Sequence, residues 1–128
     1  MLSLQICDGT PRLYIFRSRN RGLSFSEITY HEKVSQCLMS TSNKLWYLAV
    51  AKPTFSLEQF PTAEDIEVFQ IEGDTVVKME PGVWHAGPMF IDANYMDFLS
   101  LELSDTNIVD HNTHVYTREG ITFSVQFE

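Results

Sequence analysis

Short segments in which apolar and polar side chains alternate make up most of this chain. A period of two places successive side chains on opposite faces, as in a half-buried β-strand. Turn residues separate these segments, which recur roughly every ten residues. The expected strands cover residues 13–16, 23–28, 34–38, 45–51, 66–71, 75–79, 97–103 and 122–127. A set of about seven to nine such strands predicts an all-β sandwich or a small barrel.

A few segments carry further structural information. Residues 45–51 are apolar on both faces, which predicts a central strand that is covered on each side. Residues 66–71 and 75–79 are joined by Glu72-Gly73-Asp74, whose composition favours a tight hairpin. Residues 61–65 contain a Thr and two acids after a Pro, which predicts one helical turn at most.

The whole chain, residues 1–128, is expected to form a single domain. Cys7 and Cys37 are expected to be reduced thiols, and a single disulfide is the alternative. No apolar run approaches the ~20 residues that span a bilayer. The N-terminus also lacks the basic-then-apolar order of a signal peptide. These features predict a cytoplasmic protein without a membrane partner.

The charge balance bears on possible partners. Seventeen carboxylates and nine basic side chains give a net charge of −8. Proteins that bind nucleic acid need a basic surface, so nucleic acid is excluded as a partner. The one basic cluster, residues 17–22, is interpreted as a solvated loop and not as a phosphate site.

Turn chemistry surrounds one histidine. Pro81-Gly82 precedes His85 and Gly87-Pro88 follows it, so the backbone that aims this imidazole is expected to be rigid. An imidazole donates or accepts a proton near neutral pH with little tuning. If the strand at 75–79 points Val77 into a barrel, His85 is expected to point inward and Trp84 outward.

A dense polar cluster follows the strand at 97–103. It contains His111 and His114, which lie three residues apart, together with Asp105, Asn107 and Asp110. This spacing predicts that the two histidines share one helix face or surround one loop. The alternative is a loop whose polar side chains only satisfy its own backbone.

The motifs that would identify other chemistries are missing. No HxH pair occurs, so the usual histidine pair of a metal site is absent and no metal or other cofactor is expected. No serine lies in a GxSxG context, and no glycine-rich phosphate loop is present. The remaining histidine, His31, is interpreted as structural or peripheral.

The run Pro81-Gly82-Val83-Trp84-His85 resembles the second motif of the cupins, although the first cupin motif, HxHxxxxE, is absent between Lys44 and Asp74. A closer resemblance is to the short single-domain members of the ureidoglycolate lyase family, over about residues 25–115. It rests on 83–85, 97–99 and 104–107, and on strings such as 34–38, 46–53 and 109–111. The resemblance implies a cupin-type double-stranded β-helix, that is, a jelly-roll barrel with an interior ligand pocket.

The resemblance also implies cleavage of ureidoglycolate, a small polar ureido acid, to glyoxylate and urea in a homodimer without a redox cofactor. His85 is then the candidate acid or base, and Asp105, Asp110 or His111 supplies the complementary group. Asn107 is expected to hold the ureido amide. Lys52 or backbone N–H groups are expected to anchor the carboxylate, because parity places Lys78 on the opposite face of its strand. Further candidate substrate-binding residues are Trp84, Tyr47 and His114.

Two other functions are alternatives. The first is a metal-dependent cupin enzyme, such as an isomerase or a dioxygenase. The second is a small-molecule-binding protein that keeps the barrel and lacks the chemistry.

Overall fold

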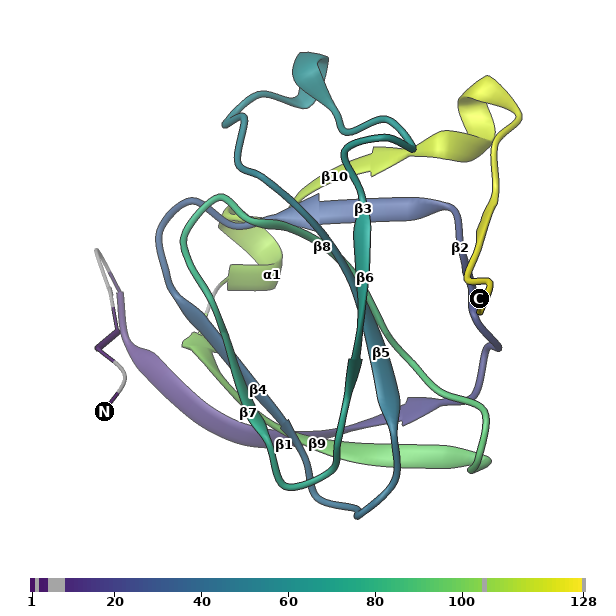
Figure 1. Cartoon of the computed structure of the whole chain (residues 1–128). Helices are drawn as coiled ribbons and strands as arrows, with labels where there is room; N and C mark the ends of the chain where they lie inside the picture. The colour runs from purple at the N-terminus through teal and green to yellow at the C-terminus, as the bar shows by residue number, and fades with distance from the viewer. Residues whose placement is uncertain (2, 5–8, 105, 128) are drawn as a thin grey trace.

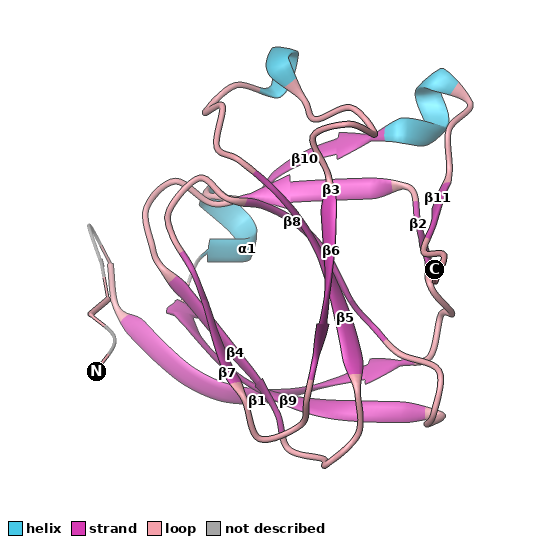
Figure 2. Cartoon of the chain, in the orientation of Figure 1, coloured by secondary structure: helices cyan, strands magenta, loops and turns pink. Residues whose placement is uncertain are grey.

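A computed structural model describes residues 1, 3–4, 9–104 and 106–127. Antiparallel strands dominate these residues, and helical structure is limited to three short turns (Figure 2). The helical turns are η1 (Leu57–Gln59), α1 (Thr106–Val109) and η2 (Tyr116–Glu119). Among the described residues, no helix has the length and apolar composition that a membrane crossing requires.

The strands form two main sheets and one short ribbon, in the following orders. The four-stranded sheet consists of β1 (Pro11–Arg19), β9 (Tyr95–Leu103), β4 (Gln36–Ser40) and β7 (Val76–Met79). The five-stranded sheet consists of β10 (Asn112–Val115), β3 (Glu27–Tyr30), β8 (Trp84–Met89), β5 (Trp46–Ala51) and β6 (Glu67–Ile71). The ribbon consists of β11 (Phe123–Ser124) and β2 (Ser24–Phe25).

The two main sheets lie on opposite sides of the molecule and face each other (Figure 1). Neighbouring strands within each sheet come from distant parts of the sequence, as in the pairing of β1 with β9. This arrangement confirms the expected fold class, an all-β cupin-type jelly-roll barrel.

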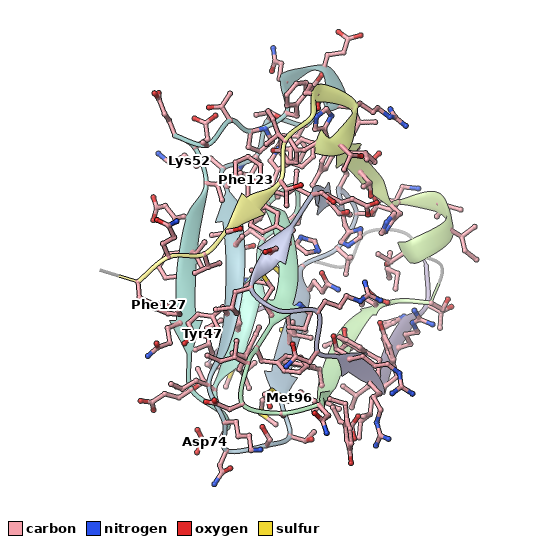
Figure 3. The ribbon with its side chains drawn as sticks, turned by 90° about the vertical axis from the view of Figure 1, so that its right-hand side faces the viewer. Tyr47, Lys52, Asp74, Met96, Phe123 and Phe127 are labelled. Atoms are coloured by element: carbon pink, nitrogen blue, oxygen red, sulfur yellow. The ribbon has the colours of Figure 1, made fainter. Side chains whose placement is uncertain are left out.

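Apolar side chains pack on both faces of the five-stranded sheet. Its inner face contributes Trp46 and Leu48 to a cluster that also contains Phe98 of the opposite sheet. Its outer face is covered by the C-terminal segment, where the ring of Phe127 lies 5.5 Å from that of Tyr47 (Figure 3). The expectation that residues 45–51 form a strand covered on each side is therefore confirmed.

Strand parity around the predicted turn is as expected. In β8, Trp84 lies opposite Ala51 on the outer face, where it is fully buried. His85 lies opposite Val50, whose side chain packs against the inner cluster. Because neighbours across a sheet share a face, the side chain of His85 points between the two sheets.

The four-stranded sheet turns the leucines of β9 outward, although their hydrophobicity would favour the inner face. In β9, Phe98, Ser100 and Glu102 are buried inside, whereas Leu99 and Leu101 lie on the outer face. On the neighbouring strand β1, Leu13 and Ile15 are 66% and 62% exposed. This sheet therefore presents an apolar outer face.

Several local predictions are wrong. β6 and β7 do not form a hairpin, because β6 pairs with β5 and β7 pairs with β4. The turn between them instead links the two sheets. This turn requires glycine at position 73, because a Cβ there would lie 2.0 Å from the carbonyl oxygen of Ser42. Residues 61–65, by contrast, form a turn held by Thr62 and Asp65, which agrees with the prediction of one helical turn at most. The C-terminal strand is limited to β11, and β10 was not predicted.

Candidate active site

A cavity of about 730 Å³ lies between the inner faces of the two sheets. One wall carries the imidazoles of His31, His85 and His111. The facing wall, which belongs to the four-stranded sheet, carries Arg12 and Glu102. The cavity therefore brings three imidazoles, which can transfer protons, and a guanidinium, which can bind an anion, to one place.

The three imidazoles of this histidine wall come from different strands or their ends. His31 follows β3, His85 lies in β8, and His111 precedes β10. The ring centroid of His31 lies 5.1 Å from that of His85 and 5.7 Å from that of His111. The turn before β8 fixes this arrangement, because the N–H of Gly82 donates to the carbonyl oxygen of His31 at 2.6 Å. Gly82 has a φ of 87°, a conformation that favours glycine.

Hydrogen bonds define the protonation of two rings. Nδ1 of His85 lies 3.2 Å from the carbonyl oxygen of Val83, and Nδ1 of His31 lies 2.5 Å from that of Asp110. A carbonyl oxygen only accepts, so each Nδ1 carries the hydrogen. Nε2 of each neutral ring is then the nitrogen with a lone pair, on the side away from the backbone.

Burial keeps these two imidazoles neutral. Burial, together with the neighbouring His31, lowers the pKa of His85 to about 4. Burial also lowers the pKa of His31, although its hydrogen bond to Asp110 opposes this effect. Both imidazoles are therefore neutral at neutral pH, and a neutral imidazole can accept a proton.

Asp110 holds the loop that precedes β10 against the end of β3. Its two carboxylate oxygens each accept a hydrogen bond of 2.8 Å, one from the N–H of Glu32 and one from the N–H of Lys33. Its carbonyl oxygen accepts from His31. Asp110 thus positions His31 and the adjacent His111.

Glu102 is the centre of the facing wall. It is 1% exposed, and its Oε1 accepts hydrogen bonds from Nη2 of Arg12 at 2.7 Å and from the hydroxyl of Tyr14 at 2.6 Å. Its Oε2 accepts from Nε2 of Gln36 at 3.0 Å. Burial raises the pKa of Tyr14, and its bond to Glu102 raises it further. The bond to Glu102 also raises the pKa of Arg12, which keeps its charge.

Four predicted substrate-binding residues lie outside the described lining of the cavity. Trp84 and Tyr47 lie on the outer face of the five-stranded sheet, and Nε1 of Trp84 donates to Thr54 at 3.1 Å. Lys52 is exposed at the end of β5 (Figure 3). The ring of His114 stacks on that of Phe60 at 3.6 Å.

Strand parity separates His111 from His114. Residues 112–115 form β10, so side chains three residues apart point to opposite faces, and the prediction of one shared helix face or loop is wrong. His111 lines the cavity, whereas His114 packs outside and bonds to Glu119 at 3.1 Å. Asp105 lies outside the described residues, as does the side chain of Asn107.

Several residues of the cavity were missed by sequence reasoning. His31 was interpreted as structural or peripheral, yet it is only 5% exposed and its ring lines the cavity. Glu102 had a signal, because it shares its strand face with Phe98 and Ser100. Arg12 and Gln36 had no such signal, since their place follows from a register that the sequence does not reveal.

The donors present do not fit the metal that cupins usually hold. Within the residues that the structure describes, no three His, Cys, Asp or Glu side chains are arranged to hold an ion. The nitrogens Nδ1 of His31 and of His85 face backbone carbonyls.

The arrangement suits a reaction that moves a proton within a small anionic molecule. Neutral imidazoles supply the base, and Arg12 supplies positive charge inside a chain whose net charge is −8. Arg21 and Glu27 also line the cavity, so its two arginines balance its two glutamates.

One comparison with known proteins identifies a family. A family model described as "Ureidoglycolate lyase" matches residues 2–122, which is nearly the whole chain. No curated protein matches the chain.

Proposed function

The chain belongs to the ureidoglycolate lyase family, and we propose that it cleaves ureidoglycolate to glyoxylate and urea in the cavity between its two sheets. The observation that supports this proposal is that neutral imidazoles on one wall face Arg12 and Glu102 on the other. The reaction needs a base, an acid and an anchor for the carboxylate. The cavity offers a group for each role.

His85 is the proposed base. Its lowered pKa leaves Nε2 unprotonated at neutral pH, and the bond from Nδ1 to Val83 holds the ring in place. Nε2 takes the proton of the substrate hydroxyl, and the oxygen then forms the C=O of glyoxylate as the C–N bond breaks. A positioned base of this kind contributes about 10²–10⁴-fold in rate.

His111 is the proposed acid. Its imidazole gives a proton to the urea nitrogen as the C–N bond breaks. One proton is taken from the substrate and one is returned, so the reaction consumes none overall. His31 lies between His85 and His111 and is proposed to return the proton between turnovers.

Arg12 is the proposed anchor for the substrate carboxylate. Its guanidinium is held by Glu102 through Nη2 at 2.7 Å, and its buried Nε has no partner among the described residues. A guanidinium is well suited to carboxylates because its donors are fixed in one plane. This assignment replaces Lys52, which is exposed outside the cavity.

The deciding experiment is glyoxylate release. Purified wild-type chain is incubated with ureidoglycolate, and glyoxylate and urea are measured over time against the spontaneous breakdown of the substrate. Equimolar release above that background is the expected result. Background release alone would sink the lyase proposal.

We also propose that the chain forms a homodimer through the outer face of the four-stranded sheet. Apolar side chains from all four strands line this face: Leu13, Ile15, Cys37, Met39, Val76, Leu99 and Leu101. An exposed apolar face of this kind marks an interaction surface, and flat sheets pack face to face.

A second copy is the proposed occupant of this face for an electrostatic reason. The charges beside it are paired within the chain, Arg17 with Asp97 at 2.9 Å and Lys78 with Glu80 at 2.7 Å. Two copies that each carry a charge of −8 therefore meet over a locally neutral surface.

A cytoplasmic location is proposed as well, and cell fractionation tests it.

A further inference from the structure

Two residues that line the cavity each carry a buried polar atom without a hydrogen-bond partner among the described residues. The two atoms are Nε of Arg12 and Oε1 of Gln36. Buried polar atoms are normally hydrogen bonded. Two such atoms without a partner beside a cavity therefore point to a ligand, or to the water that a ligand replaces. The proposed anchor uses Arg12 and leaves Gln36 without a role.

Glu102 determines which way the amide of Gln36 is turned. Nε2 of Gln36 lies 3.0 Å from Oε2 of Glu102. This carboxylate accepts three hydrogen bonds, from Arg12, Tyr14 and Gln36, so the amide must present its NH₂ group to it. The atom left without a partner is Oε1, which only accepts, on a residue that lines the cavity. A ligand satisfies this acceptor if it places an N–H donor next to Gln36.

The position of Gln36 is fixed by the same sheet that carries the proposed anchor. Gln36 begins β4, which pairs with β9, and Arg12 lies in β1, which also pairs with β9. Both side chains are held by Glu102 of β9. The wall therefore presents one donor from Arg12 and one acceptor from Gln36 in a fixed relation.

We propose that Gln36 determines specificity by accepting a hydrogen bond from the terminal NH₂ of a ureido group. The ligand class is a small carboxylate that carries a ureido group, with Arg12 on the carboxylate and Gln36 on the NH₂. This inference rests on the proposed function for the ligand class, and it adds the residue that separates a ureido acid from an N-acyl amino acid. A site that hydrogen-bonds an N–H rejects an analogue that lacks it, because its acceptor is left unpaired.

Two unreactive ligands test the inference by isothermal titration. Ureidoacetate keeps the carboxylate and the ureido group but lacks the hydroxyl whose proton starts the cleavage. N-acetylglycine differs from it only by a methyl group in place of the terminal NH₂. Wild-type chain is expected to bind ureidoacetate at least about tenfold more tightly than N-acetylglycine.

The variant Gln36→Met removes the acceptor and keeps a similar volume. Its affinity for ureidoacetate is expected to fall to that for N-acetylglycine, whose own affinity stays within about twofold of the wild-type value. Circular dichroism verifies the fold, and if Gln36→Met does not fold, Gln36→Asn is measured for the same loss. Equal affinities in the wild type, no binding of either ligand, or a preference that survives the substitution would each overturn the inference.

The binding test and the glyoxylate assay can each contradict one proposal without contradicting the other. A wild-type chain that prefers ureidoacetate but releases no glyoxylate supports the role of Gln36 and overturns the lyase proposal. A chain that releases glyoxylate but binds the two ligands equally supports the lyase proposal and overturns the role of Gln36.

Discussion

His31 and His85 place their imidazole rings 5.1 Å apart, each with Nδ1 bonded to a backbone carbonyl. Two protonated rings at this distance would repel each other, and burial already disfavours the charged form. The pair therefore remains neutral at pH 7, which gives the cavity a base without a buried positive charge.

Replacing the proposed base is expected to remove most of the activity. His85→Ala should lower kcat for glyoxylate release by about 10²–10⁴-fold, because Nε2 is no longer present to take the hydroxyl proton. The matched control is Arg118→Ala, which truncates an exposed side chain in η2 away from the cavity. Equal release by His85→Ala and the wild type would clear His85 of the chemistry.

The pKa of His85 predicts how stability depends on pH. The unfolded chain protonates this imidazole near 6.5 and the folded chain near 4, so the unfolded state binds more protons between these values. The free energy of unfolding is therefore complete above about pH 6.5 and falls as the pH drops toward 4. Between pH 7 and pH 5 the loss from this group should be about 1–2 kcal/mol.

Urea unfolding at pH 7 and pH 5 measures this loss. His85→Gln should lose less stability than the wild type between the two pH values, because the glutamine does not titrate. His31 has a lowered pKa as well, so part of the pH dependence remains in the variant. Identical pH dependence in both proteins would contradict the assignment of a buried neutral His85.

Replacing the proposed anchor is expected to weaken substrate binding. Arg12→Gln should raise KM for ureidoglycolate by about tenfold or more, since a charged hydrogen bond to the carboxylate is lost. Arg19→Gln is the matched control, because Arg19 lies in the same strand, is exposed, and is outside the described lining of the cavity. A KM that changes equally in the two variants would show a general effect of charge.

A charge on the outer sheet face is expected to separate the proposed dimer. Leu13→Asp should convert the wild-type dimer to a monomer in sedimentation equilibrium, because burying an unpaired carboxylate is costly. Ile108→Asp is the control, since Ile108 is 83% exposed on α1 and does not belong to this sheet. The interface is wrong if Leu13→Asp sediments as the wild type does.

Alternation in the sequence predicts which side chains share a face, but it leaves open which face is inside. In β8 the face that alternation assigns to His85 is the inner one, so its inward orientation is predicted correctly. In β9 the leucines Leu99 and Leu101 are on the outer face, and Glu102 is inside with its three donors. The cavity is polar on this wall, so hydrophobicity alone gives the wrong side.

The candidate site depends on contacts between residues far apart in sequence. Arg12 meets Glu102 because β1 pairs with β9, and His31 meets His111 because β3 pairs with β10. A single sequence indicates where the strands lie but not which strands pair with one another. For that reason the sequence predicts that His85, with its rigid flanking turns, points into the barrel, whereas it does not predict that His31 and the proposed anchor Arg12 line the same cavity.

Asp110 couples two parts of the histidine wall mechanically. Its bonds to Glu32, Lys33 and His31 join the end of β3 and the start of β10 into one unit. This unit is also tied to the strand that carries His85, because β3 pairs with β8 and the N–H of Gly82 donates to the carbonyl oxygen of His31. The spacing of the histidine wall, and with it the room left beside the wall for a ligand, is therefore set by backbone bonds.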